Sequence, residues 1–449
     1  MSFETIAQAA SALSAGSVTA AQLVEEALER IGDPGGEGRH AFVSVQASQA
    51  RAAAQAMDAL RGAGRAPSIW AGIPISIKDL YDQTGEITRA GSVAREGASP
   101  APVTAPAVLR LEQAGFIVLG RTNMSEFAFS GLGVNPHYGT PRSPWDRKVG
   151  RLPGGSSSGA AVATADGMGF AGLGSDTGGS CRIPAALCGI VGWKPTAQRV
   201  PLAGVLPLSS TLDSLGPLAR SVACCGLLDS VMSGEDARHD DVPAIRGLRF
   251  AVLQGYVAEG WDSDVTAAFE RALSRLSAAG AQIERLCVPE LADIPAANAA
   301  GGFVAPEAWA WHRDLVASKR EAYDPRILAR ILRGERMAAA DYIDLVQARA
   351  RISAAIAQRT RAFDAIVMPT CPLIPPAIAD VEDEAAYNRI NLLLLRNPSV
   401  ANFLDRCAIS IPCHRPGDPP VGFTLMGERM GDRRLLAAAA AAEAALAEP

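Results

Sequence analysis

The stretch Leu152–Thr196, LPGGSSSGAAVATADGMGFAGLGSDTGGSCRIPAALCGIVGWKPT, decides how the rest of the chain is interpreted. It contains two serine-glycine clusters, at 154–159 and 176–180, separated by small apolar residues. Glycine at this density weakens helices and strands, so packing alone is not expected to select it. It permits unusual φ values and lets backbone N–H groups approach a ligand closely. A serine at the end of a Gly-Gly turn is therefore a candidate nucleophile with amide donors around it.

The composition is that of an ordinary globular protein. The chain has 449 residues, 48% of them hydrophobic and 20% charged, with a formal net charge of -5. This charge gives no indication of a nucleic-acid or acidic-membrane partner. The N-terminus MSFETIAQAA lacks a basic start and a long apolar run, so we expect no signal peptide and no membrane segment. The eight cysteines follow neither a zinc nor a disulfide spacing, which predicts a reducing cytoplasm and no metal.

Helix and strand patterns alternate along the whole chain, which predicts one large α/β domain. Helices are expected over 4–32 (two, the second with a capping box from Thr19 and Gln22), 46–63, 105–114, 221–232, 263–279, mainly 305–363, and 432–447. Strands are expected over 72–79, 116–119, 190–193, 248–253, 282–288, 365–368, 408–412 and 421–425. The segment 235–243 is polar and is expected to be a surface connection. No linker or internal repeat divides the chain, so the late strands are expected to return to the early sheet.

Three short motifs match other enzyme classes but lack the required context. The GxGxxG match at 167–172 follows a helix-like run and leads into a strand-like segment, which reverses the dinucleotide-binding order and predicts a helix C-terminus. The GxSxG match at 155–159 has no clear preceding strand. The Asp-Thr-Gly triplet at 176–178 has no second copy, as an aspartic protease requires. None of the five histidines, of which His137 is nearest, is well placed to serve the serine clusters.

A serine nucleophile then needs a lysine base, and Lys78 is the candidate. It ends the apolar strand pattern Gly-Ile-Pro-Ile-Ser-Ile-Lys, where burial would lower the pKa of its ammonium from about 10.4 toward neutrality. The other interpretation is a strand-end surface lysine paired with Asp79. The pattern alone gives the two interpretations equal weight.

Longer motifs add a resemblance to a known family. Residues 154–196, with Gly-Ser-Asp-Thr-Gly-Gly-Ser and Arg-Ile-Pro-Ala-Ala, resemble the amidase signature family. So do the segments around Lys78, Gly120–Phe127 and Ser143–Asp146, and the similarity runs over most of 66–220. The resemblance implies a single amidase domain over 1–449 with its signature core at about 66–220, and an α/β fold with a mixed central sheet flanked by helices.

The resemblance also implies a catalytic triad and an oxyanion hole. Ser180 matches the nucleophile, Ser156 a bridging serine in a cis peptide, and Lys78 the base. The backbone amides of Thr177, Gly178, Gly179 and Ser180 match the oxyanion hole. Asp176 and Arg182 are expected to brace the loop as a charged pair. Cys181, beside the nucleophile, is expected to pack rather than react.

The implied reaction is hydrolysis of a small-molecule carboxylic amide through an acyl-enzyme, without a cofactor. The alternative is the A subunit of a glutamine amidotransferase, which supplies ammonia for tRNA-dependent amidation; a binding protein without activity has no need of all three triad residues. The acyl pocket is expected within segments 125–135, 300–345 and 370–405. Its candidate apolar lining comprises Met124, Phe127, Phe129, Phe303 and Trp309. The arginine-rich region 305–363 is expected to form part of the surface, a lid or an interface. A homodimer is therefore one of the assemblies that the sequence allows.

Overall fold

One mixed β-sheet runs through the molecule. The computed structural model describes residues 3–235 and 242–447. In this part of the chain the sheet has 11 strands in the order β1-β3-β2-β4-β6-β5-β10-β11-β9-β7-β8. The strands are β1 (Phe42–Val45), β2 (Pro74–Lys78), β3 (Ile117–Thr122), β4 (Ala171–Ser175), β5 (Val191–Lys194), β6 (Leu215–Ala219), β7 (Arg249–Gln254), β8 (Gln282–Cys287), β9 (Ala365–Pro369), β10 (Ala408–Pro412) and β11 (Gly422–Met426).

The pairing of the strands confirms that the chain returns to its early sheet. β2 lies parallel to both β3 and β4, and β7 lies parallel to β8 and β9. These two parallel groups are joined by antiparallel strands, among which β10 pairs with β5 on one side and β11 on the other. The single mixed sheet of an α/β protein, as the sequence predicts, therefore connects residues from 42 to 426.

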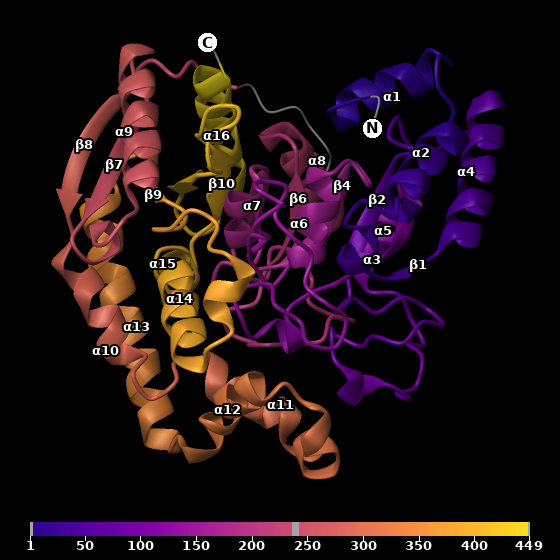
Figure 1. The fold of residues 1–449 in the computed structure, drawn as a ribbon. Helices are drawn as coiled ribbons and strands as arrows, with labels where there is room; N and C mark the ends of the chain where they lie inside the picture. Colours follow the sequence, from indigo (N-terminus) through magenta and orange to yellow (C-terminus); the bar gives the residue numbers. More distant parts are fainter. Residues whose placement is uncertain (1–2, 236–241, 448–449) are drawn as a thin grey trace.

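Helices flank the sheet along its length (Figure 1). α1, α2 and α4 lie at the end of the molecule near β1, α9 and α13 lie near β7 and β8, and α11 and α12 project below the rest. The helices are α1 (Ile6–Ser14), α2 (Ala20–Gly32), α3 (Gly38–Ala41), α4 (Ala47–Gly62), α5 (Pro106–Gln113), α6 (Ser158–Ala165), α7 (Arg182–Cys188), α8 (Val222–Ser233), α9 (Ser263–Ala278), α10 (Asp293–Ala297), α11 (Val304–Lys319), α12 (Pro325–Leu332), α13 (Ala339–Thr360), α14 (Glu384–Arg396), α15 (Pro398–Phe403) and α16 (Asp432–Ala447).

Most of the predicted elements are present within a residue or two of their expected ends. The capping box of α2 forms as predicted, with the Thr19 side chain accepting from the Gln22 backbone N–H. The GxGxxG match begins two residues after the end of α6 and runs into the start of β4, as expected from its reversed context. The predicted surface connection 235–243 lies mostly outside the described residues. β1, β6, α7 and α14 are additional elements that the pattern did not predict.

The glycines of the deciding stretch are used for packing as well as for turns. A Cβ on Gly172 in β4 would lie 2.8 Å from Ala160 Cβ in α6, and one on Gly192 in β5 would lie 2.4 Å from the Cys181 carbonyl oxygen. Glycine therefore lets the segments that begin α6 and α7 lie directly on the sheet. The serines that precede these two helices are thereby brought to the ends of the central strands.

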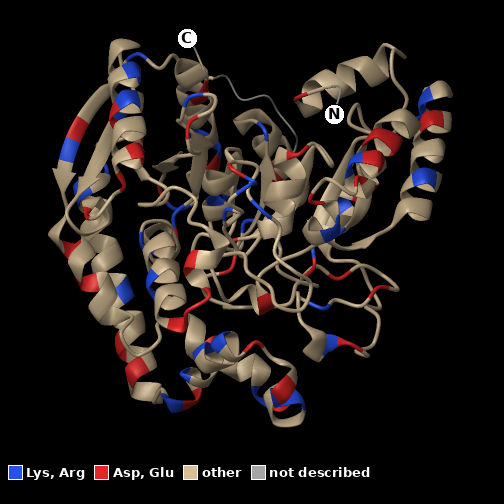
Figure 2. Cartoon of the chain, viewed as in Figure 1, with Lys and Arg blue, Asp and Glu red and all other residues tan. Residues whose placement is uncertain are grey.

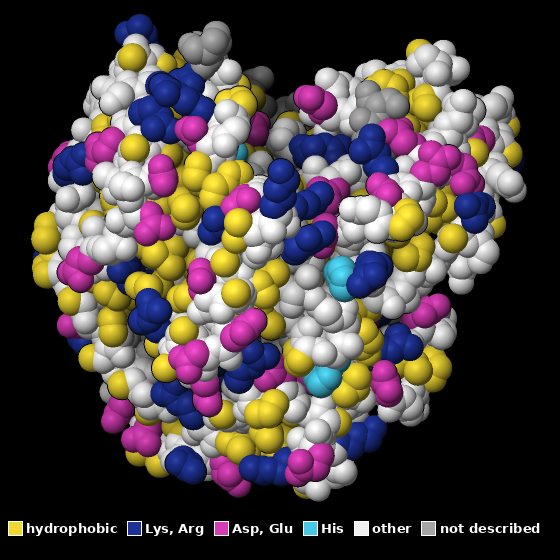
Figure 3. Space-filling view, viewed as in Figure 1, with side chains coloured by type: hydrophobic (Ala, Val, Ile, Leu, Met, Phe, Trp, Pro, Cys, Tyr) yellow, Lys and Arg dark blue, Asp and Glu magenta, His cyan; other side chains and the backbone are white. Residues whose placement is uncertain are grey.

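Charged side chains are concentrated on the helices and the outer strands. Figure 2 shows both signs distributed over the helices around the sheet, and Figure 3 shows them interspersed on the visible face. Among the residues described, no helix combines the length and apolarity needed to cross a bilayer.

Candidate active site

Lys78 and Ser175 end two neighbouring parallel strands. Ser76 in β2 pairs with Gly172 in β4, so both strands finish at the same edge of the sheet. Lys78 Nζ lies 2.9 Å from Ser175 Oγ and 2.6 Å from Ser156 Oγ. The edge at the carboxyl ends of parallel strands is where open α/β sheets place their ligands.

The structure resolves the two interpretations of Lys78. Its side chain is fully buried, and Asp79 pairs with Arg121 at 2.7 Å instead of with the lysine. Burial lowers the pKa of Lys78 to about 8, against the opposing influence of Cys181, Asp176 and Asp213. No carboxylate of the described residues contacts Nζ directly, so burial dominates, and about a tenth of this amine is uncharged at pH 7.

Ser156 and Ser180 come from loops that lead into α6 and α7. The Gly155–Ser156 peptide bond is cis, as the resemblance implies. The two loops are joined by a hydrogen bond from Ser157 N–H to the Ser180 carbonyl oxygen at 3.3 Å. Ser180 lies on the wall of a cavity, whereas Ser156 is fully buried and its Oγ accepts from Lys78 Nζ. Within the described chain no hydrogen bond joins the two serine hydroxyls directly; catalytic contacts are often longer in a free enzyme than with substrate bound.

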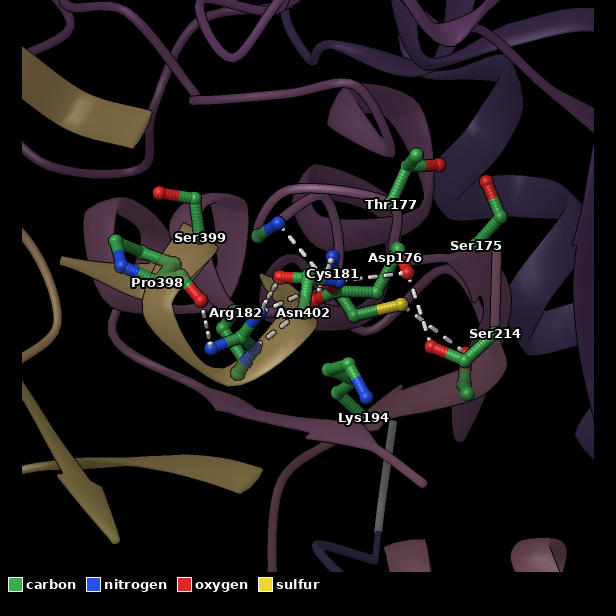
Figure 4. A network of polar contacts seen from close by, with 12 residues as sticks. Ser175, Asp176, Thr177, Cys181, Arg182, Lys194, Ser214, Pro398, Ser399 and Asn402 are labelled. Carbon is green, nitrogen blue, oxygen red and sulfur yellow. Dashed lines mark hydrogen bonds and ion pairs between the residues drawn. The ribbon is translucent and has the colours of Figure 1, made fainter. Parts of the chain in front are cut away.

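Asp176 holds the loop that carries Ser180 (Figure 4). Its carboxylate accepts from the Gly179 N–H at 2.9 Å and the Cys181 N–H at 3.1 Å. It also forms a fully buried ion pair with Arg182 at 2.9 Å and accepts from Asn402 Nδ2 at 2.9 Å. Burial alone would raise the pKa of Asp176, but Arg182 and its other partners outweigh burial and lower it to about 2. The pair expected to brace the loop therefore stays ionised and contacts the loop at several points.

Four backbone amides were predicted to form an oxyanion hole, and they differ in whether their N–H groups already have a hydrogen-bond acceptor. The Gly179 N–H donates to Asp176, so it serves the loop rather than a ligand. The N–H groups of Thr177, Gly178 and Ser180 donate to no atom of the described residues, and these three residues line the cavity. These three amides can stabilise a developing oxyanion.

The cavity above the loop has a volume of about 440 Å³. Phe129 and Phe303 form part of its wall, as expected. Met124 does not line it: the side chain is fully buried, and the Met124 carbonyl oxygen accepts from Asn135 Nδ2 at 2.8 Å. The Met124 prediction is corrected accordingly, because an apolar residue after a buried strand packs inward. Phe127 and Trp309 are also not among the residues that line the cavity.

Two arginines of α12 and Arg333, directly after it, line the same cavity, and the sequence analysis did not single them out. Arg326 pairs with Asp324 at 2.7 Å, but Arg330 and Arg333 form no ion pair with any described residue. Arg330 donates to the Phe129 carbonyl oxygen at 2.6 Å and to Asn388 Oδ1 at 3.2 Å. Positions 326, 330 and 333 repeat at the i, i+4, i+7 spacing of one helix face. That spacing is the sequence feature from which a shared arginine face could have been predicted.

A metal centre is not evident in the part of the chain that the structure describes, where no three His, Cys, Asp or Glu side chains gather as ligands. His137, the histidine nearest the serines in sequence, contacts Glu126 at 3.0 Å.

Comparison with known proteins identifies the family of the chain. The family model described as Amidase matches residues 22–436. The chain belongs to the amidase signature family. A solved amidase structure superimposes with a TM-score of 0.88 at 33% identity, covering 98% of this chain and 99% of the other. The chain is thus an amide-hydrolysing enzyme, and the Ser-Ser-Lys triad and acyl-enzyme are features of its family.

Two curated amidase relatives differ in their named activities. The 2-amino-5-chloromuconic acid deaminase of Comamonas testosteroni is 35% identical over 91% of this chain and 89% of its own length. The A subunit of the glutamyl-tRNA(Gln) amidotransferase of Synechococcus sp. (strain CC9605) is 33% identical over 94% of this chain and 92% of its own length. Family membership therefore leaves the substrate to be inferred from the site.

Proposed function

We propose that this amidase hydrolyses a carboxylic amide to an acid and ammonia or an amine through Lys78, Ser156 and Ser180. One observation carries the proposal: buried Lys78 Nζ lies 2.6 Å from Ser156 Oγ, beneath the cavity wall that Ser180 forms. We also propose that the whole chain is one catalytic domain, with its core at about 66–220. The eight cysteines are all free thiols, which supports a cytoplasmic location.

The reaction begins with proton transfer to the neutral amine. Lys78 takes the proton of Ser156 as Ser156 takes that of Ser180, and Ser180 Oγ attacks the amide carbon. The amides of Thr177, Gly178 and Ser180 stabilise the oxyanion. The proton then returns through Ser156 to the nitrogen, the C–N bond breaks, and water hydrolyses the resulting ester to the acid.

The cavity favours an acyl group that carries a carboxylate. Arg330 and Arg333 face it without a carboxylate partner in the described chain, and burial lowers the pKa of Arg330. A partly buried guanidinium is stabilised by an anion that it can bind in bidentate fashion. Phe129 and Phe303 provide apolar walls in the same cavity as these arginines and Ser180. The named acid substrate of the Comamonas relative supports the same choice.

The test compares matched amides. Monoamides of dicarboxylic acids and neutral amides of the same chain length are supplied to wild type and to Ser180→Ala, with ammonia release as the readout. We expect turnover by wild type only, with higher kcat/KM for the anionic amides. Turnover by Ser180→Ala would remove Ser180 as nucleophile, and equal kcat/KM for both series would remove the carboxylate preference.

A second candidate function is that of an amidotransferase component, which the Synechococcus relative supports. That function would make ammonia release from glutamine depend on partner proteins. Glutamine turnover by the isolated chain, compared with turnover after addition of such partners, separates the two candidates. Full activity of the chain alone favours the free-standing amidase.

A further inference from the structure

A second loop, residues 208–214, lies against the loop that carries Ser180. Asp176 N–H donates to the Ser214 carbonyl oxygen at 2.8 Å, and Ser214 N–H donates back at 3.2 Å. Ser214 Oγ also donates to the Asp176 carbonyl oxygen at 2.9 Å. The side chain of Thr177 points away from the Asp176–Arg182 pair (Figure 4). Thr177 Oγ1 donates instead to Asp213 Oδ1 at 2.5 Å.

Asp213 joins the two loops through a single buried carboxylate. Its second oxygen accepts from the N–H groups of Leu208 at 2.9 Å and Ser209 at 3.1 Å, and only 6% of the residue is exposed. Burial raises the pKa of Asp213 to about 6, although the hydrogen bonds from Thr177, Ser209 and Leu208 oppose this. The group is therefore mostly ionised at neutral pH. Leu208 lines the cavity, so the loop contacts both the substrate space and the oxyanion amides.

Glu307 holds the same loop from the first turn of α11. Its carboxylate accepts from Ser209 Oγ at 2.5 Å, from the Thr211 N–H at 3.0 Å and from Thr211 Oγ1 at 2.5 Å. The hydroxyl of Tyr342 in α13 donates to it at 2.7 Å. Phe303, at the start of the same helix, lines the cavity. A continuous series of hydrogen bonds thus leads from α11, which carries Glu307, through the 208–214 loop and Asp213 to Thr177.

We propose that Asp213 and Glu307 are positioning residues that set the Thr177 and Gly178 amides against the substrate carbonyl. The inference rests on the proposed function. Neither carboxylate reaches the reacting atoms, so neither is a catalytic residue. Because the amides stabilise charge that develops only in the transition state, loss of their position lowers kcat more than it changes substrate binding.

Thr177→Val and Asp213→Asn test the contact from its two ends. A misplacement of about 1 Å in a catalytic site can cost about 100-fold, so we expect kcat to fall by about tenfold to 100-fold. KM stays within about threefold, and affinity for a boronic acid that forms a tetrahedral serine adduct falls in proportion to kcat. Thr177→Ser keeps the hydroxyl and recovers most of the lost rate.

A matched control exists in the same chain. Thr196 Oγ1 donates to Asp432 Oδ2 at 2.7 Å, and both residues are buried but absent from the cavity wall. Thr196→Val therefore removes a threonine–aspartate bond, and with it the bond that Thr196 Oγ1 accepts from the Met430 N–H at 2.9 Å. We expect it to lower the unfolding temperature at least as much as Thr177→Val does while kcat stays at the wild-type value.

Glu307→Gln tests the connection to α11 through a more exposed residue. We expect a threefold to tenfold fall in kcat in the wild-type background and a much smaller fall in the Thr177→Val background, because the series is already broken there. The proposal would be overturned if the effects of Glu307→Gln and Thr177→Val on kcat were fully additive. It would also be overturned if Thr177→Val had the same kcat as Thr196→Val. Failure of the proposed function is a separate result, since it appears as turnover by Ser180→Ala.

Discussion

The pH dependence of turnover examines the central chemistry most directly. The base must be uncharged, and burial lowers the pKa of Lys78 to about 8. With that pKa, about 1% of the amine is neutral at pH 6, about 10% at pH 7 and about 90% at pH 9. We therefore expect kcat/KM to rise about tenfold from pH 6 to 7 and about 90-fold from pH 6 to 9.

The assay measures ammonia release at substrate concentrations well below KM, where kcat/KM reports the ionisation of the free enzyme. A monoamide whose own charge is constant above pH 6 keeps the substrate out of the profile. Lys78→Arg provides the control, because a guanidinium stays protonated throughout this range. Its residual activity should lack the rise.

Replacement of Asp213 tests the direction in which its carboxylate shifts the pKa of Lys78. The Asp213 carboxylate raises the pKa of Lys78, so Asp213→Asn should move the rise in kcat/KM to lower pH while it lowers the plateau. A wild-type midpoint between pH 6 and 7 that persists in Lys78→Arg would refute the lysine as base and indicate a histidine.

The remaining predictions concern the acyl-enzyme, the loop, the cavity and stability. Ser180→Ala should give no covalent adduct by mass spectrometry after mixing with an ester substrate, whereas wild type shows one. Asp176→Asn leaves the buried Arg182 unpaired, which costs about 3–5 kcal/mol, and should lower the unfolding temperature well below that of wild type. Arg330→Met should raise KM for anionic amides by about tenfold or more and leave neutral amides within about twofold. Lys78→Met removes a group whose pKa in the folded protein, about 8, lies below its value in the unfolded chain. The free energy of unfolding of wild type should therefore rise relative to that of the variant as pH increases from about 8 to 10.5. Urea unfolding measures this difference, and the same pH dependence in both proteins would contradict it.

Sequence periodicity located most of the sheet because its strands are short, apolar and bounded by turns. β6 was not predicted: Leu215–Ala219 reads LGPLA, and glycine and proline argue against a strand. Its backbone nevertheless pairs with β4 and β5 on its two sides. Close packing explains the glycine, since a Cβ on Gly216 would lie 1.9 Å from the Trp193 carbonyl oxygen. Tertiary contacts thus override the local preference.

The candidate site was likewise predictable from the sequence only in part. Lys78 and the two serine loops could be located because each follows or precedes a recognisable element with its own sequence motif. The segments of the cavity wall were also located, since most lining residues fall within the expected 125–135, 300–345 and 370–405. The individual wall residues could not be predicted, because they come from α11, α12 and α14, whose relative positions depend on side-chain packing over long sequence separations. Met124 illustrates the error: an apolar residue near a loop is compatible with a wall or a core, and only the packed structure distinguishes them.

The neutrality of Lys78 depends on where its neighbouring acids are engaged. Asp79 follows it directly, but successive residues along an extended strand point to opposite sides, and Asp79 pairs with Arg121. Asp176 is occupied by Arg182 and by amides of the Ser180 loop, and Asp213 by Thr177 and its own loop. Asp176 and Asp213 therefore raise the pKa of Lys78 only from a distance, while Nζ contacts hydroxyls. The same contacts that fix the oxyanion amides keep the carboxylates off the lysine, so positioning of the loop and activation of the base arise from one arrangement.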